Sequence, residues 1–196
     1  LFINTSGVGK VPVGIDISGA RAKEDDVIVV SGTIGDHGIA VLSAREDLGF
    51  ETALESDVAP LNHLVQAMLG AGEIHVLRDP TRGGLATSLV EISEQSNVTI
   101  EINEQTLPVK PAVKAACEML GFDPLYVANE GKLVAFVKAS AVDNVLNAMR
   151  RTKYGEEAVV IGKVIGTGKS QVRLKTAIGG TRLVDMMPGE MLPRIC

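Results

Sequence analysis

A glycine-bearing turn, Ser31–Gly38 (SGTIGDHG), places an acid and a titratable base, Asp36 and His37, just ahead of a run typical of a helix. Backbone N–H groups at a helix N-terminus attract anions, and phosphate in particular. This turn is not a Walker loop, because it lacks the Gly-Lys-Ser/Thr ending. The turn is therefore a candidate phosphate site with acid–base groups, or else a tight turn in which Asp36 only caps the helix.

A second turn, Asp79–Gly84 (DPTRGG), has the same layout, with a strand run before it and a helical run after it. Arg82 supplies a permanent cation whose planar donor fork suits phosphate, and Thr81 supplies a hydroxyl. The alternative is a helix start at which Asp79 and Arg82 pair. Two such turns favour phosphate handling, because each leaves helix-terminal N–H groups to be satisfied.

The segment Asn129–Lys132 (NEGK) interrupts an otherwise apolar region with Glu130. A carboxylate in such surroundings is a candidate general base. The alternative is a plain hairpin turn in which Asn129 and Gly131 take the turn conformations.

Cys117 and Cys196 are the only cysteines, which excludes a disulfide framework and a four-cysteine zinc site. Cys117 lies on a helical apolar stripe and is expected to be buried. Cys196 is the last residue, and Arg194 favours its nucleophilic thiolate. A terminal thiol on an arm of about ten residues, spanning about 30 Å when extended, suits a carrier, unless the cysteine is incidental.

The histidines do not indicate a metal site. His63 and His75 form no recognisable metal-ligand spacing with His37, and both are expected to be structural.

Composition narrows the function classes. The 196 residues are 45% hydrophobic and 22% charged, as in ordinary globular proteins. A net charge of −5 and only 3% aromatic residues argue against a nucleic-acid partner. No apolar run reaches the roughly 20 residues of a membrane span, and no signal peptide is present, so the expected compartment is the cytoplasm.

Strand and helix patterns interleave, and the end of the chain is rich in strands. The expected strands are Phe2–Asn4, Val13–Ile17, Asp26–Val30, Ile74–Leu77, Val98–Ile102, Leu133–Val137, Val159–Ile165, Val172–Leu174 and Arg182–Val184. The expected helices are Asp36–Glu46, one capped by Ser56, one after Gly84, and two on the stripes that contain Val113 and Val145. Several connections are short enough for hairpins. These patterns predict an α+β fold with a mixed, largely antiparallel sheet and packed helices.

Five motifs together carry a family resemblance. They are SGTIGDHG at Ser31–Gly38, RDPTRGG at Arg78–Gly84, LPVKPAV at Leu107–Val113, NEGK at Asn129–Lys132 and PRIC at Pro193–Cys196. In this order they resemble the HypE family of hydrogenase maturation proteins, within the aminoimidazole ribonucleotide synthetase-like (PurM-like) superfamily. The terminal PRIC is specific to that family, whereas the glycine loops are shared across the superfamily.

The resemblance implies a C-terminal portion of a two-domain protein. The chain opens at Leu1 without an initiator methionine, as if inside a strand. We expect residues 1–17 to be a remnant of an N-terminal ATP-binding domain and its linker. Residues 18–185 are expected to form a PurM-like C-terminal domain, and residues 186–196 a flexible tail that carries Cys196.

The resemblance also implies a reaction. A carbamoyltransferase, HypF, loads a carbamoyl group onto Cys196, and ATP with Mg²⁺ then drives its dehydration to a thiocyanate. The cyanide passes to iron on a HypC–HypD scaffold, for the nickel-iron hydrogenase centre. The implied catalytic residues are Cys196 as carrier, Glu130 as base and His37. The implied phosphate-binding residues are Gly35, Asp36, Gly38, Thr81, Arg82, Gly83 and Gly84, and no protein metal ligand is assigned.

Two alternatives stay open on the sequence alone. The chain is a non-enzymatic docking module, or it is another ATP-dependent enzyme of the same superfamily in which the tail plays no part. The family's nucleotide-binding acidic residues and lysine, which precede this region, are missing from the chain. The full-length protein is expected to form a homodimer.

Overall fold

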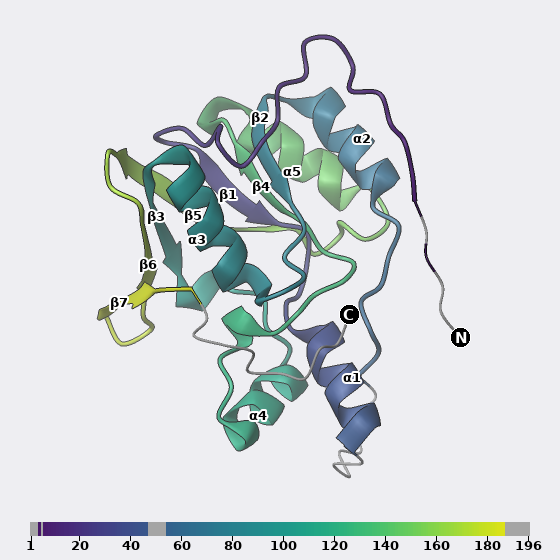
Figure 1. Cartoon of the computed structure of the whole chain (residues 1–196), viewed down its shortest axis with the longest axis vertical. Coiled ribbons are helices and arrows are strands. Elements are labelled where there is room, and N and C mark those ends of the chain that lie inside the picture. The colour runs from purple at the N-terminus through teal and green to yellow at the C-terminus, as the bar shows by residue number, and fades with distance from the viewer. Residues whose placement is uncertain (1–3, 5, 47–53, 187–196) are drawn as a thin grey trace.

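Runs of β-branched residues form the centre of a seven-stranded sheet in the computed structural model, which describes residues 4, 6–46 and 54–186 (Figure 1). The strands are β1 (Val27–Val30), β2 (Ile74–Arg78), β3 (Val98–Asn103), β4 (Val134–Val137), β5 (Val159–Thr167), β6 (Gln171–Lys175) and β7 (Thr181–Val184). Their order in the sheet is β2-β4-β1-β5-β3-β6-β7. All neighbouring pairs are antiparallel except β3 and β6, which confirms the predicted mixed, largely antiparallel sheet.

Helices pack against both faces of this sheet. They are α1 (Asp36–Glu46), α2 (Asn62–Ala71), α3 (Gly84–Ser96), α4 (Pro111–Leu120) and α5 (Val142–Arg150), joined by short 3₁₀ turns η1 (Glu104–Thr106), η2 (Pro124–Tyr126) and η3 (Ala139–Ala141). In Figure 1, α2 and α5 lie side by side against one face and α3 against the other, while α1 and α4 lie together beyond the end of β1.

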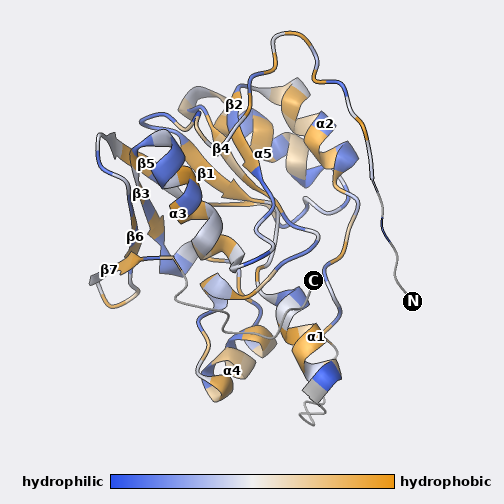
Figure 2. Cartoon of the chain, in the orientation of Figure 1, coloured by the Kyte–Doolittle hydropathy of each residue, from blue (hydrophilic) through white to orange (hydrophobic). Residues whose placement is uncertain are grey.

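The pleat of the central strands divides the core into two layers. Ile28 and Val30 of β1, with Phe136 of β4, pack with α3, whereas Val29 packs with α2 and α5. Ile28, Val29 and Phe136 are fully buried. In Figure 2 the strand β1 is hydrophobic along its length, whereas α3 carries both hydrophobic and hydrophilic residues. The buried residues of α3 include Leu85, Leu89 and Ile92. A third cluster, with Ile39 and Val113, joins α1 to α4.

The strand β3 lies between β5 and β6, although residues 168–170 alone connect those two strands. The Gly168 N–H donates to the Asn97 carbonyl at 2.8 Å, and the Thr99 hydroxyl donates to the Lys169 carbonyl at 2.8 Å. These bonds hold the connection across the start of β3. A hairpin, which the short connections predicted, is formed by β6 and β7 but not by β5 and β6.

Two expectations about elements are wrong. Val13–Ile17 is not a strand, because Pro12 and Gly14 form a turn closed by the Ile15 N–H on the Pro12 carbonyl at 3.2 Å. Val13 is fully exposed there, with no sheet partner to cover it. Ser56 does not cap α2, whose N-cap position is Leu61 and carries no side-chain cap. The expected strand Phe2–Asn4 falls largely outside the described residues.

Candidate functional site

The turn after β1 is tied down at Asp36, the first residue of α1. The Thr33 hydroxyl donates to Asp36 Oδ2 at 2.5 Å, and Lys110 Nζ lies 2.9 Å from the same oxygen. Asp36 is 1% exposed, and its Oδ1 is buried with no hydrogen-bond partner in the structure. Asp36 therefore forms an ion pair with Lys110, which the helix-cap alternative did not predict. One of its two carboxylate oxygens has no hydrogen-bond donor.

His37 faces Glu130 across the space between two loops. The His37 ring is buried, with its Nδ1 2.8 Å from Ser56 Oγ and its Nε2 4.0 Å from Glu130 Oε1. His37 Nε2 has no hydrogen-bond partner, and the Glu130 side chain is 30% exposed. The structure thus brings together the two residues predicted to act as base and as its companion. A proton donor or acceptor placed between them would reach both.

Asn129 connects the three motif loops. Its Oδ1 accepts the Gly35 N–H at 2.8 Å, and its Nδ2 donates to the carbonyls of Pro80 at 2.9 Å and Val127 at 3.1 Å. Asn129 is 1% exposed, so this amide is a buried and fully engaged structural link. The segment Asn129–Lys132 lies between η2 and β4 and does not join two paired strands. The alternative prediction of a hairpin turn is therefore wrong.

The predicted phosphate-binding residues of the second turn surround the start of α3. Gly83 is the N-cap of this helix, and Thr81 donates to Asp79 Oδ2 at 2.9 Å. Arg82 is exposed and makes no hydrogen bond or ion pair with the described residues, so it does not pair with Asp79. The guanidinium is thus available to a ligand, but the structure records no direct contact between this turn and His37 or Glu130.

The predicted glycines are explained by packing inside the protein. Gly84 has φ 62°, and a Cβ there would come 2.5 Å from the Leu125 carbonyl oxygen. A Cβ at Gly38 would come 2.4 Å from the Val127 side chain, and the Gly38 N–H already donates to the Ala128 carbonyl at 3.1 Å. Phosphate binding by these loops stays a prediction. The groups that could bind phosphate are the side chains and backbone amides that have no partner within the protein.

Two cations in the loop cluster lack a carboxylate partner among the described residues. Lys132 is half-buried, and a Cβ on Gly32 would lie 3.5 Å from its Nζ. Like Arg82, it has no ion-pair partner in the described part of the chain. Each of these two cations can bind a phosphate oxygen. His37 Nε2 and Asp36 Oδ1 are also buried without a hydrogen-bond partner, but the Asp36 oxygen is an acceptor that a cation, not a phosphate, would satisfy.

Of the two cysteines, the structure describes Cys117 only. Cys117 is 1% exposed in α4, as predicted, and burial together with the negative charge of Asp123 raises the pKa of its thiol to about 11. Cys196 and most of the expected tail lie outside the described residues. Asp185, just before this tail, accepts a hydrogen bond from the Tyr126 hydroxyl at 2.9 Å on its backbone carbonyl.

The remaining histidines lie away from this cluster. His75 is buried, and its Nδ1 lies 2.8 Å from Asp26 Oδ1 while its Nε2 lies 2.9 Å from Glu73 Oε1, which confirms a structural histidine. His63 is exposed on α2. Within residues 4, 6–46 and 54–186, no group of three or more His, Cys, Asp or Glu is arranged to hold a metal ion.

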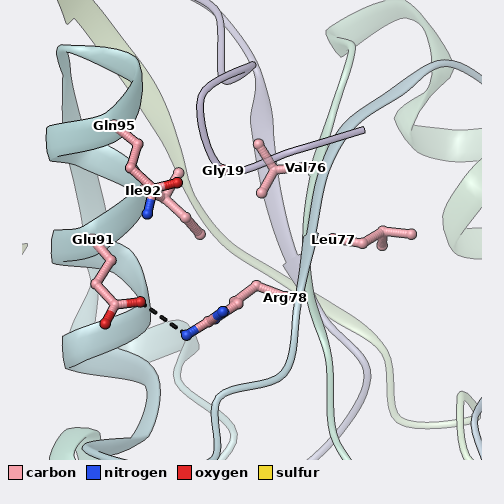
Figure 3. Close-up of a pocket in the computed structure, with 7 residues that line it drawn as sticks. All are labelled: Gly19, Val76, Leu77, Arg78, Glu91, Ile92 and Gln95. Carbon is pink, nitrogen blue, oxygen red and sulfur yellow. Dashed lines mark hydrogen bonds and ion pairs between the residues drawn. The ribbon is translucent and has the colours of Figure 1, made fainter. Parts of the chain in front are cut away.

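A separate small pocket lies between β2 and α3, away from the loop cluster (Figure 3). Its volume is about 100 Å³, and the Arg78–Glu91 ion pair at 2.9 Å closes one side of it. The two charged residues that line it are paired with each other, so this pocket offers no unpaired charge.

Sequence patterns missed three residues of the cluster: Ser56, Asp57 and Lys110. Ser56 was interpreted only as a helix cap, and Lys110 lies within a recognised motif but was given no role. Asp57 Oδ1 accepts the backbone N–H of Glu130 at 3.0 Å. A Ser-Asp pair ahead of a proline was the one available signal, and it does not reveal a distant partner.

Comparison with known proteins shows the family to which this chain belongs. The family model of the AIR synthase related protein, C-terminal domain, matches residues 23–175. The chain belongs to this family. The motif resemblance to the C-terminal portion of HypE is confirmed as well, by relatives that align with the whole chain.

Three such relatives span a wide range of organisms. Carbamoyl dehydratase HypE of Cupriavidus necator is 55% identical, and that of Escherichia coli is 43% identical. A putative hydrogenase expression/formation protein of Methanocaldococcus jannaschii is 42% identical. Each alignment covers 100% of this chain but only 56%, 58% and 58% of the respective relative. The chain therefore spans little more than half the length of these relatives.

Solved structures agree with this assignment. A crystal structure of the hydrogenase maturation protein HypE is 45% identical with a TM-score of 0.91, covering 96% of this chain and 61% of that one. HypE in complex with ATP gives a TM-score of 0.86 at 45% identity, covering 92% and 55%, and a HypE–HypF complex gives 0.83 at 49% identity, covering 87% and 56%. A thiamine monophosphate kinase of Aquifex aeolicus, 21% identical with a TM-score of 0.54, shares the fold alone.

These matches confirm the PurM-like C-terminal-domain fold that the motifs predicted. Among the described helices of this AIR synthase related domain, none is both long and apolar enough to cross a membrane.

Proposed function

We propose that this chain is the C-terminal part of an ATP-dependent carbamoyl dehydratase that serves hydrogenase maturation. The observation that supports it best is the pairing of His37 with Glu130, 4.0 Å apart, in a loop cluster with unpaired cations. The relatives named carbamoyl dehydratase HypE, and the HypE structure in complex with ATP, support an ATP-driven dehydration as the reaction. Residues 1–17 would belong to the preceding domain and its linker, and residues 186–196 would carry the substrate.

The proposed substrate is a carbamoyl group held as an S-thiocarbamate on Cys196. ATP, when bound, supplies the phosphoryl group that turns the carboxamide oxygen into a leaving group. One amide proton passes to a base as the oxygen is phosphorylated, the second leaves with the departing phosphate, and the carbon–nitrogen bond becomes the triple bond of a thiocyanate. The cyano group then passes as cargo to an electron-rich iron centre, which supplies the electron pair of the new iron–carbon bond while Cys196 leaves as a thiolate. The compartment proposed for this chemistry is the cytoplasm.

Each residue of the cluster has a task in this scheme. Glu130, partly exposed and facing His37, accepts an amide proton, and His37 donates to the transferring phosphate or orients the tail. Arg82 and Lys132 bind phosphate oxygens. Gly35, Gly38, Thr81, Gly83 and Gly84 shape the loops around the phosphate. Asp36 has the free carboxylate oxygen suited to the Mg²⁺ that accompanies ATP.

The proposed partners follow from the same chemistry. A carbamoyltransferase of the HypF type loads Cys196, in line with the solved HypE–HypF complex. A HypC–HypD scaffold receives the cyanide, and the complete protein acts as a homodimer.

Intact-protein mass spectrometry tests the carrier role. The chain is incubated with HypF, its carbamoyl donor and ATP, beside the Cys196→Ala variant and, as a matched control, Cys117→Ala. We expect one carbamoyl adduct on the wild type and on Cys117→Ala, and none on Cys196→Ala. An adduct that persists on Cys196→Ala would contradict the proposal.

A second arm separates the enzyme from the alternatives. A chimera that joins the N-terminal part of the Cupriavidus necator relative to this chain is given the same reagents. We expect its adduct to lose the mass of one water only when ATP is present. Retention of the carboxamide in the chimera would favour a docking module, and ATP turnover unaffected by Cys196→Ala would favour another ATP-dependent enzyme.

A further inference from the structure

Two adjacent residues, Ser56 and Asp57, contact both members of the acid–base pair. Ser56 Oγ lies 2.8 Å from Nδ1 of His37, which comes from the turn after β1. Asp57 Oδ1 accepts the backbone N–H of Glu130 at 3.0 Å and that of Gly131 at 3.4 Å, from the loop before β4. A single short segment thus links two loops that are far apart in the sequence.

The backbone of the Ser56–Asp57 segment also packs closely against the loop that contains Glu130. A Cβ added to Gly131 would lie 1.7 Å from the Asp57 carbonyl oxygen and 2.6 Å from the Ala59 nitrogen. Glycine is therefore required at this position by the close approach of two backbones. The Val58 N–H donates to Ser56 Oγ at 3.4 Å, which restrains the hydroxyl that faces His37.

Stability alone does not account for Asp57. Its Oδ2 is buried and has no hydrogen-bond partner, while both amide bonds go to Oδ1. A buried carboxylate oxygen without a donor costs free energy. A group kept at such a cost is typical of a position selected for the geometry of a site.

We propose that Ser56 and Asp57 are positioning residues that hold His37 and Glu130 at their mutual distance. The use of this geometry in dehydration rests on the proposed function, whereas the geometry itself does not. General acid–base groups must be held within about 0.5 Å of their productive positions. Ser56 fixes the orientation of the imidazole, and Asp57 fixes the backbone from which the Glu130 carboxylate projects.

The geometric part is tested on the 196-residue chain without any substrate. Amide hydrogen exchange is followed at Glu130 and Gly131 in the wild type, Asp57→Ala and Asp57→Asn, with exposed Glu156→Ala as a matched control. We expect exchange at both amides to accelerate about tenfold or more in Asp57→Ala only, because asparagine keeps the acceptor oxygen. Unchanged exchange in Asp57→Ala would overturn the proposal, whatever the activity.

The Ser56 contact has its own readout in the nitrogen-15 spectrum of the His37 ring. Ser56→Ala removes the partner of Nδ1 and is expected to move the Nδ1 resonance, whereas Ser56→Thr keeps the hydroxyl and the resonance. The signals of His63 and His75 serve as internal controls for folding. A Nδ1 resonance that is the same in Ser56→Ala and the wild type would overturn the Ser56 assignment.

The functional part is tested in the chimera. We expect Asp57→Ala to lower kcat for dehydration about tenfold or more with KM for ATP within about twofold, and Asp57→Asn to restore kcat to within about threefold. Accelerated exchange with unchanged kcat would overturn the positioning role. A chimera that is inactive with wild-type Ser56 and Asp57 would count against the proposed function, while the exchange and ring measurements still decide the geometry.

Discussion

Cys117 and Cys196 illustrate how the surroundings of a side chain decide its chemistry. Cys117 packs in the cluster between α1 and α4, where burial and the charge of Asp123 hold the pKa of its thiol at about 11. Because only the thiolate is nucleophilic, this cysteine is inert at neutral pH. Of the two cysteines, Cys196 is therefore the one that we propose as carrier.

We expect iodoacetamide at pH about 8 to modify Cys196 of the native protein and to leave Cys117 unmodified, because a thiol with a pKa of about 11 is almost entirely protonated there. Peptide mapping by mass spectrometry measures the reaction at each site. In urea both cysteines should react, which controls for intrinsic reactivity. Modification of Cys117 at the same rate with and without urea would show that its burial does not protect it.

Glu73 gives a pH dependence whose sign is fixed. Hydrogen bonds from Lys138 at 2.8 Å and from His75 at 2.9 Å lower the pKa of this carboxyl from 4.5 to about 2. The unfolded chain therefore binds more protons than the folded chain between these values. The contribution of Glu73 to stability is complete above pH about 4.5 and is lost as the pH falls towards about 2.

Urea denaturation at decreasing pH measures this contribution. We expect the gap in unfolding free energy between the wild type and Glu73→Gln to shrink as the pH falls below about 4.5. Because the Glu73 side chain is 48% exposed, the gap is small even at neutral pH. Glu156→Gln, an exposed control, should show a gap that does not change with pH. A Glu73 gap that widens on acidification would contradict the assigned ion pair.

At the scale of elements, the junction of α3 with η2 fixes how two motif loops meet. Gly84 begins α3 with φ 62°, and its α-carbon faces the carbonyl oxygens of Leu125 and Val127, which a Cβ would approach to 2.5 and 2.6 Å. Neither backbone atom can turn away as a flexible side chain would. Gly84 therefore sets the distance between the Arg82 turn and the loop that leads to Glu130.

We expect Gly84→Ala to lower the free energy of unfolding by clearly more than the roughly 1–2 kcal/mol that a left-handed conformation alone costs a non-glycine residue. Gly121→Ala is the matched control, because Gly121 has φ 71° with nothing within 4 Å of its Cβ position. Chemical denaturation of both variants gives the comparison. Equal losses would mean that the contact with η2 adds nothing to the conformational cost.

The spacing of apolar residues predicted most of the helices and strands, but not which of them pack or pair with one another. The stripes at Val113 and Val145 became α4 and α5, and the helix from Asp36 to Glu46 matches α1 at both ends. Apolar spacing reports which face of an element is buried, so these predictions needed no knowledge of neighbours. The strand expected at Val13–Ile17 was wrong because β-branched composition does not supply a pairing strand: Val13 is exposed and Ile17 packs against the core without joining the sheet.

The residue types in the motifs predicted which loops form the candidate site, but not which residues of different loops contact one another. The pairing of His37 with Glu130 depends on two loops that are joined by contacts of Asn129, Ser56 and Asp57, among others. No local pattern states that the Asp57 carboxylate faces the amide of Glu130, because that contact is made by the packing of the whole sheet and its helices. The placement of β3 between β5 and β6 was likewise invisible in the short connection of residues 168–170.

For the whole molecule, the question is how much of the reaction this domain performs alone. It contains the Glu130–His37 pair and Cys196, but it spans little more than half of its relatives. Arg82 and Lys132 offer two phosphate-binding cations, too few on their own to replace the contacts that a complete nucleotide site makes with base, ribose and triphosphate. Loading of the carrier and its dehydration are therefore expected to separate.

We predict that the isolated chain accepts the carbamoyl group on Cys196 and keeps it as a carboxamide in ATP, whereas the chimera dehydrates it. Within the chimera, Glu130→Gln should lower kcat by about 10²–10⁴-fold, the usual contribution of a general base, without preventing loading. Glu156→Gln, which removes an exposed carboxylate elsewhere, should leave both steps unchanged. Dehydration by the isolated chain would place the whole ATP site within these 196 residues. Full activity of Glu130→Gln would instead move the base to another residue of the complete protein, and the 4.0 Å pair would lose its catalytic meaning.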